Sequence, residues 1–107
     1  MSERIIHATV ANFDELVKKD GLCLVDFWAN WCGPCKMMHH VLEQLTSEMG
    51  DKVKILKVDV DKNLDLAKSF GIQSVPTLMI FKNGNNLWRQ SGAISAKDLK
   101  AKIEIFL

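Results

Sequence analysis

Apolar and polar positions along this chain repeat with two different periods. Short runs that alternate, or that are apolar on both faces, predict strands, and apolar residues three and four positions apart predict helices. Strands are expected at residues 5–8, 22–29, 53–60, 77–82 and 86–91, and helices at residues 12–19, 32–49, 63–70 and 95–106. The order β-α-β-α-β-α-β-β-α predicts an α/β fold, with a mixed central sheet of about five strands flanked by four helices.

Capping residues mark the ends of the first and last helices. Asn12, with Glu15 three residues on, is typical of an N-cap and capping-box pair. Asp20-Gly21 predicts the end of that helix. Ser95 and Asp98 predict the start of the last helix in the same way as the first.

Two strand signals are more specific. Residues 22–29 are apolar on both alternating faces except at Asp26, which is typical of a central strand covered on both sides. Asn83-Gly84 predicts a tight hairpin, because this pair tolerates the positive φ angles that such turns require. We therefore expect a partly parallel sheet with an antiparallel hairpin at one edge.

Composition and charge narrow the classes of protein that fit. The chain has 107 residues, 48% of them apolar and 25% charged, which predicts a single domain over residues 1–107. The formal charge is only +1 and basic residues are scattered, so nucleic acid is not an expected partner. No apolar run could cross a bilayer, and the first residues lack a signal peptide's apolar stretch. We expect a cytoplasmic protein without membrane contact.

The candidate chemistry lies in Trp31-Cys32-Gly33-Pro34-Cys35-Lys36, between the central strand and a helix. Two thiols on the first turn of a helix lie on one face and can close a small disulfide ring. Cys32, exposed at the helix start, is the expected nucleophile, because free N–H groups and the helix dipole favour a thiolate there. Cys35, one turn inside and more shielded, is expected to be the resolving thiol.

Two other uses of the cysteine pair remain open from the residues alone. Half a zinc site would need a second pair of ligands, and His39 and His40 lie on the same helix as the cysteines. A structural disulfide closing so short a loop would stabilise the fold little. The third cysteine, Cys23, has apolar neighbours and is predicted to be buried and unreactive.

The chain resembles the thioredoxin family over essentially its whole length. The resemblance rests on Val25-Asp26-Phe27-Trp28-Ala29, Trp31-Cys32-Gly33-Pro34-Cys35-Lys36, Val75-Pro76-Thr77, Phe81-Lys82-Asn83-Gly84 and Gly92. It implies the thioredoxin fold, reduction of disulfides in other proteins and no bound cofactor. It also implies that a flavoprotein thioredoxin reductase supplies electrons from NADPH. We expect the chain to act as a monomer.

The resemblance assigns roles to four residues. The Cys32 thiolate attacks a substrate disulfide, and Cys35 then displaces the reduced substrate, leaving a Cys32–Cys35 disulfide. Asp26 is expected beneath the dithiol, where burial raises its pKa and where it relays a proton to or from Cys35. Lys57 is similar to the family's partner for this carboxylate. From the pattern alone, a solvent-facing Asp26 and an ordinary surface Lys57 remain alternatives.

A docking surface for an extended substrate segment is also implied. Val75-Pro76 is similar to the family's cis-proline turn, which faces the dithiol and offers backbone hydrogen bonds. The surface would consist of Trp31, Gly33, Pro34, Val75, Pro76, Gly92 and Ala93. Trp28 is expected to pack beneath the site.

The chain departs from the family pattern at His39-His40, where a proline is usual. Because His40 keeps its N–H group, we expect one continuous helix from about Pro34 to Met49, with both imidazoles facing solvent. In a sharper alternative, one of them protonates between about pH 6 and 7 and stabilises the thiolate.

Two other functions fit the same fold. Disulfide oxidases and isomerases commonly place a histidine between the cysteines, whereas Gly33-Pro34 favours a reductant. A non-catalytic docking subunit would keep its function after the replacement Cys32→Ser, which a reductant would not.

Overall fold

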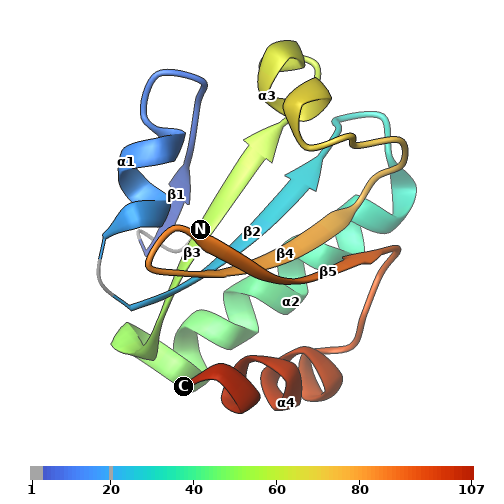
Figure 1. Cartoon of the computed structure of the whole chain (residues 1–107). Helices are drawn as coiled ribbons and strands as arrows, with labels where there is room; N and C mark the ends of the chain where they lie inside the picture. The colour runs from blue at the N-terminus through green and yellow to red at the C-terminus, as the bar shows by residue number, and fades with distance from the viewer. Residues whose placement is uncertain (1–3, 20) are drawn as a thin grey trace.

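A mixed sheet with helices on both faces organises the chain in the computed structural model, which describes residues 4–19 and 21–107 (Figure 1). The strands are β1 (Ile5–His7), β2 (Leu22–Trp28), β3 (Val53–Asp59), β4 (Thr77–Lys82) and β5 (Asn85–Ser91). The helices are α1 (Phe13–Lys18), α2 (Gly33–Met49), α3 (Leu64–Ser69) and α4 (Ala96–Phe106), with a short 3-10 turn, η1 (Gly50–Lys52). The predicted fold class and element order are confirmed, whereas η1 was not expected.

Strand β2 lies at the centre of the sheet. The strand order is β1-β3-β2-β4-β5, with β1, β3 and β2 parallel and β4 and β5 antiparallel to their neighbours. Every residue of β2 before Trp28 is buried. In the register of the sheet, Asp26 pairs with Lys57 of β3 and with Leu78 of β4. The central covered strand expected from the apolar run is therefore confirmed.

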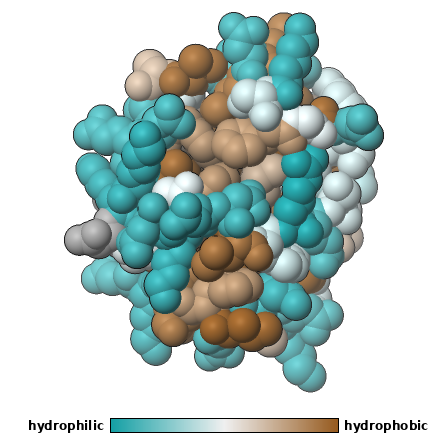
Figure 2. All heavy atoms as spheres, in the orientation of Figure 1, coloured by the Kyte–Doolittle hydropathy of each residue, from teal (hydrophilic) through white to brown (hydrophobic). Residues whose placement is uncertain are grey.

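Alternation along the strands divides the core between the two faces of the sheet. Leu24 packs with Met38 and Leu99 on the face covered by α2 and α4, and Phe27 packs with Phe13 and Leu66 on the face covered by α1 and α3. Successive side chains point to opposite faces, so Asp26 lies on the same face as Leu24, under α2. On the side of the molecule drawn in Figure 2, hydrophilic residues surround several separate apolar areas.

The helix caps follow the predicted scheme in one case and depart from it in another. The Asp98 N–H donates to Ser95 Oγ at 3.1 Å, as expected at the start of α4. Asn12 does not cap α1 with its side chain, since its Oδ1 accepts a hydrogen bond from the Thr9 N–H at 2.7 Å. The capping-box prediction is therefore wrong: the loop before α1 occupies this acceptor. α1 ends at Lys18, and of the predicted end signal, Asp20 lies outside the described residues.

The hairpin between β4 and β5 is confirmed and is one residue tighter than expected. Asn83 and Gly84 have φ angles of 53° and 87°, and Lys82 pairs directly with Asn85. Two consecutive positive φ angles match the right-handed twist of the flanking strands. Asn85 therefore belongs to β5 rather than to the turn.

We predict that Gly84→Ala destabilises the protein by about 1 kcal/mol. The φ of Gly84 is +87°, and an added Cβ would lie 3.1 Å from Cγ of Lys18. Urea unfolding midpoints measure the effect. Gly33→Ala is the matched control, because a Cβ at Gly33 meets no atom within 4 Å. An equal loss in both variants would contradict the prediction.

Candidate active site

The cysteine pair lies at the carboxyl end of β2, where the chain turns into α2. Helix α2 begins at Gly33, so Cys32 is its N-cap residue. The Cys35 N–H donates a hydrogen bond to Sγ of Cys32 at 3.2 Å. This N–H belongs to the first turn, whose amides have no partner within the helix. The Cys32 sulfur therefore sits where the helix dipole and an amide stabilise negative charge, as a thiolate nucleophile requires.

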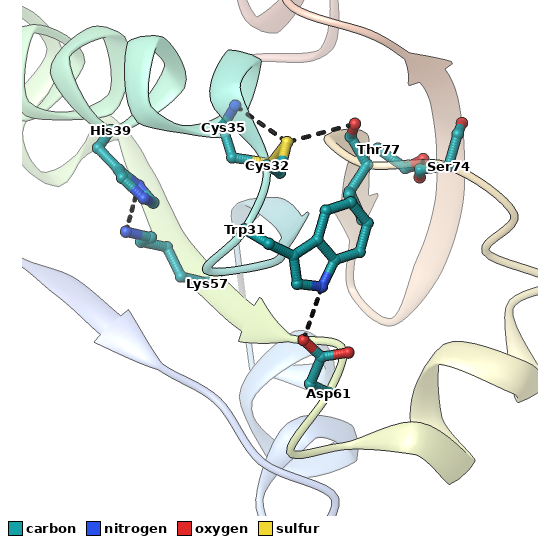
Figure 3. Close-up of a disulfide and its surroundings, with 9 residues drawn as sticks. Trp31, Cys32, Cys35, His39, Lys57, Asp61, Ser74 and Thr77 are labelled. Carbon is teal, nitrogen blue, oxygen red and sulfur yellow. Dashed lines mark hydrogen bonds between the residues drawn. A yellow bond between two sulfur atoms is a disulfide. The ribbon is translucent and has the colours of Figure 1, made fainter.

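Cys32 and Cys35 form a disulfide (Figure 3). Cys32 is 4% exposed and Cys35 is fully buried. The expected exposure of Cys32 is therefore wrong for this oxidised form, because Trp28, Val60 and Val75 pack against the pair. The order of accessibility is still as predicted, with Cys35 the more shielded sulfur.

The turn at Val75-Pro76 faces the disulfide. The peptide bond between these residues is cis, as the resemblance implied. Sγ of Cys32 lies 3.5 Å from the Val75 carbonyl oxygen. The Gly92 N–H donates to the Pro76 carbonyl oxygen at 2.8 Å, which joins the segment after β5 to this turn. Three segments distant in sequence thus meet around Cys32.

Residues predicted for the docking surface differ in their exposure. Trp31 is 72% exposed, and Gly33, Pro34 and Ala93 are also exposed. Val75 and Gly92 are half-buried, and Pro76 is buried. A partner would therefore meet mainly the indole ring and the first turn of α2, with Val75 and Gly92 at the edge of the disulfide.

Asp61 orients the exposed indole, a role that sequence reasoning missed. Nε1 of Trp31 donates a hydrogen bond to Oδ2 of Asp61 at 3.0 Å (Figure 3). Asp61 follows β3, which is parallel to β2, so the segments after both strands emerge at the same edge of the sheet. The predicted parallel topology could have indicated this contact, because residues that follow β3 lie near the loop that contains Trp31.

Asp26 is a carboxylate buried on the face of the sheet that α2 covers. It is fully buried, and neither of its carboxylate oxygens accepts a hydrogen bond from the described residues. Burial raises the pKa of Asp26 to about 7, and the positive charge of Lys57 opposes that rise. The carboxyl group can therefore exchange a proton near neutral pH.

Lys57 lies beside Asp26 in the sheet but bonds elsewhere. Its ammonium group contacts Nδ1 of His39 and lies 4.8 Å from the centre of the Trp28 ring. Burial lowers the pKa of Lys57, while the charges of Asp26 and Glu43 act in the opposite direction. The predicted pairing of Lys57 with Asp26 is therefore present as strand register and as electrostatic attraction, without a hydrogen bond between them.

Helix α2 is continuous at His39-His40, as expected, yet the two imidazoles differ. The helix runs unbroken over Gly33–Met49, and His40 is exposed. His39 is half-buried, with its ring edge-on to Trp28 at 5.1 Å, so the prediction that both rings face solvent is wrong for His39. Burial and the neighbouring charge of Lys57 lower the pKa of His39, which disfavours its protonation between pH 6 and 7.

The remaining cysteine and histidine residues form no second centre. Cys23 is buried, and burial raises the pKa of its thiol to about 12, against the opposing charge of Lys54. Among residues 4–19 and 21–107, no three His, Cys, Asp or Glu side chains are grouped as a metal site requires. The disulfide is thus the chemical centre that the described residues present.

Comparison with known proteins agrees with this geometry. The thioredoxin family profile matches residues 4–105. The chain belongs to the thioredoxin family. It is 42% identical to a thioredoxin of Pseudomonas aeruginosa over 97% of each chain. It is also 51% identical to a thioredoxin of Bacillus subtilis, over 75% of this chain and 76% of the relative.

This family member is a thiol–disulfide oxidoreductase, a protein-disulfide reductase with Cys32 and Cys35 as its redox centre. A chloroplastic thioredoxin Y of rice is a further relative, 41% identical over 90% of this chain and 58% of the relative. No helix in the part of the chain that the structure describes is long and apolar enough to span a membrane.

We predict that Asp26→Asn stabilises the protein, and that the gain grows with pH. The pKa of Asp26 is about 7 in the folded protein, against about 3.9 in the unfolded chain. The unfolded chain therefore loses this proton first as pH rises, and the ionised carboxylate destabilises the fold progressively between these values. At about 1.4 kcal/mol per pH unit, the gain approaches at most about 4 kcal/mol above neutrality.

Denaturant midpoints between about pH 4 and pH 8 measure this gain. Asp65→Asn, at an exposed position in α3, controls for the loss of a surface carboxylate. A gain that is independent of pH, or a net loss of stability for Asp26→Asn, would contradict the prediction.

Proposed function

We propose that this protein is a general reductant of disulfides in other proteins, with Cys32 as the attacking sulfur. The observation that carries this proposal is the hydrogen bond from the Cys35 N–H to the Cys32 sulfur at the N-cap of α2. In the reduced protein the same amide favours the Cys32 thiolate over the thiol. The residues between the cysteines, Gly33 and Pro34, contain no titratable group, which favours a reductant over an oxidase.

The reaction transfers two electrons in two exchanges. First, the Cys32 thiolate attacks one sulfur of a substrate disulfide, forms a mixed disulfide and releases the other substrate sulfur as a thiolate. Second, the Cys35 thiol loses its proton and attacks the Cys32 sulfur, which breaks the mixed disulfide. The substrate is then fully reduced, and the protein contains a Cys32–Cys35 disulfide.

Asp26 accepts the proton of Cys35 in this scheme. It lies on the α2 face of the sheet, is fully buried and has a pKa of about 7. A base is most effective when its pKa lies close to the working pH. Lys57, its register partner on β3, supplies a positive charge that favours the ionised form of the carboxylate.

The substrate docks on the surface around Cys32. The exposed Trp31 indole and the exposed Gly33, Pro34 and Ala93 provide an uncharged contact. Val75, Pro76 and Gly92 border the disulfide, where Val75 offers its backbone to an extended segment. The contact is mostly backbone and ring surface, which suits substrates of varied sequence.

Electrons return to the disulfide from NADPH through a flavoprotein thioredoxin reductase. The protein acts as a monomer in the cytoplasm, where a reducing environment keeps protein thiols reduced. An assay with NADPH, such a reductase and insulin tests this flow directly. We expect NADPH consumption that depends on both proteins. If no NADPH is consumed, the reductase partnership is contradicted, whereas the disulfide exchange is tested separately.

We predict that Cys32→Ser abolishes insulin reduction, whereas Cys35→Ser attacks substrates and stalls as a mixed disulfide. Only the sulfur of Cys32 caps the helix, and only Cys35 can resolve the adduct. Non-reducing gels of each variant after incubation with cell extract reveal the adducts. Cys23→Ala, which removes the buried third cysteine, is the matched control and should retain activity.

The gels also distinguish the alternatives. Adducts on Cys32→Ser rather than on Cys35→Ser would reverse the assigned roles. A docking subunit without redox turnover would lose neither its partners nor its function in Cys32→Ser.

We further predict that Asp26→Asn slows resolution of the mixed disulfide by about tenfold or more at pH 7, because general bases typically contribute at least that much. Stopped-flow measurement of the second exchange, following rapid formation of the adduct, tests this. If the rate at pH 7 is that of the parent, Asp26 is not the base.

A further inference from the structure

A cavity of about 610 Å³ is lined by residues of β1, α2 and β3, among them Lys57, the register partner of Asp26. Its lining includes His7, Trp28, His39, His40, Glu43 and Lys57. Of these residues, Trp28 also packs against the disulfide. The cavity is therefore a polar neighbour of the redox centre that disulfide exchange alone does not explain.

His39, Lys57 and Trp28 position one another in this cavity. The Lys57 ammonium group donates a hydrogen bond to Nδ1 of His39, a contact drawn in Figure 3. The same ammonium group lies 4.8 Å from the centre of the Trp28 ring, and the His39 ring meets that ring edge-on at 5.1 Å. An ammonium over an indole face gains a cation–π attraction, so two contacts hold it at Trp28.

Asp26 receives none of the Lys57 hydrogen bonds, although the two residues are register partners on parallel strands. Paired side chains of neighbouring strands lie on the same face of a sheet, so the ammonium group has a competing site at the carboxylate. A direct contact would satisfy two buried charges. The acceptor that holds Lys57 in the other position belongs to His39.

We propose that His39 is a positioning residue: its Nδ1 holds the Lys57 ammonium group at Trp28 and away from Asp26, which leaves the carboxylate free to accept the Cys35 proton. This inference rests on the proposed role of Asp26 in the reductase cycle. His39 belongs to the His39-His40 pair at which this chain departs from the family pattern.

His39 must be neutral to accept this hydrogen bond, and its surroundings favour the neutral form. The titratable groups that line the cavity with it are His7 from β1, Lys57 from β3, and His40 and Glu43 from α2. Asp26 from β2 acts on Lys57. Burial, and then the charges of Lys57, His40 and His7, lower the pKa of His39. His39 is therefore already neutral at the pH where Asp26, with a pKa of about 7, becomes ionised.

The test uses ¹³C NMR to monitor the titration of the Asp26 carboxyl carbon. It is done in the oxidised protein, where Cys32 and Cys35 do not titrate. We expect His39→Ala to move the Asp26 titration to lower pH by about one unit, since direct contact with a cation lowers a carboxyl pKa by about 1–3 units. His39→Leu, which keeps the volume without an acceptor, should do the same. His39→Asn, whose Oδ1 replaces Nδ1 as acceptor, should restore the parent titration.

Two controls isolate the contact. His40→Ala removes the exposed neighbouring imidazole and should leave the Asp26 titration where it is in the parent. In a Lys57→Met background, His39→Ala should cause no further shift, because there is no ammonium group left to reposition. The pH profile of mixed-disulfide resolution should move with the titration, and its plateau should fall roughly threefold for the weaker base.

An unchanged or raised Asp26 titration in His39→Ala and His39→Leu would overturn the inference. So would a shift in His39→Asn as large as in His39→Ala, or one that persists without Lys57. The titration needs no substrate, so it can be read even if the parent fails to reduce insulin. In that case the proposed function fails, while the positions of Lys57 and Asp26 are still determined.

Discussion

Strand β2 is hydrogen-bonded to β3 on one side and to β4 on the other, and helices cover both of its faces. All of its residues before Trp28 are buried. Any polar group placed on this strand therefore loses its hydration, and any loop that follows it begins at the middle of the sheet. Asp26, beneath α2, is the polar group that loses its hydration. The cysteine pair, at the N-terminus of α2, lies in the loop that begins at the middle of the sheet.

The site contains one group whose negative charge is stabilised, the Cys32 sulfur, and one whose negative charge is destabilised, the Asp26 carboxylate. At the N-cap of α2, an amide and the helix dipole favour a negative Cys32 sulfur. Under the same helix, a negative Asp26 is costly because no residue in the described part of the chain donates a hydrogen bond to it. The Asp26 carboxylate therefore takes up a proton more readily than it would in water, while negative charge on the Cys32 sulfur is favoured. Both effects arise from one helix packed on one strand.

Several site features could be predicted from short stretches of sequence because their causes are local. The spacing of Cys32 and Cys35 after an apolar run places both at the start of a helix, and Asn83-Gly84 selects its turn through backbone sterics alone. Asn12 shows the limit of such reasoning, since its side chain does not cap the helix that its position predicts. Its Oδ1 accepts a hydrogen bond from the Thr9 N–H instead, and this contact depends on the path of the preceding loop.

The sequence by itself determined the element order, the buried central strand and the position of the cysteine pair at the start of a helix, since periodicity and spacing act over a few residues. Only the tertiary structure decided which groups meet across elements. It brought His39 into contact with Lys57 and Trp28, and Asp61 within hydrogen-bond distance of the Trp31 indole. It also covered Cys32 with Val60 and Val75. These contacts join residues from different strands, helices and loops, and their partners are set by how the sheet and α2 pack, which no local pattern records.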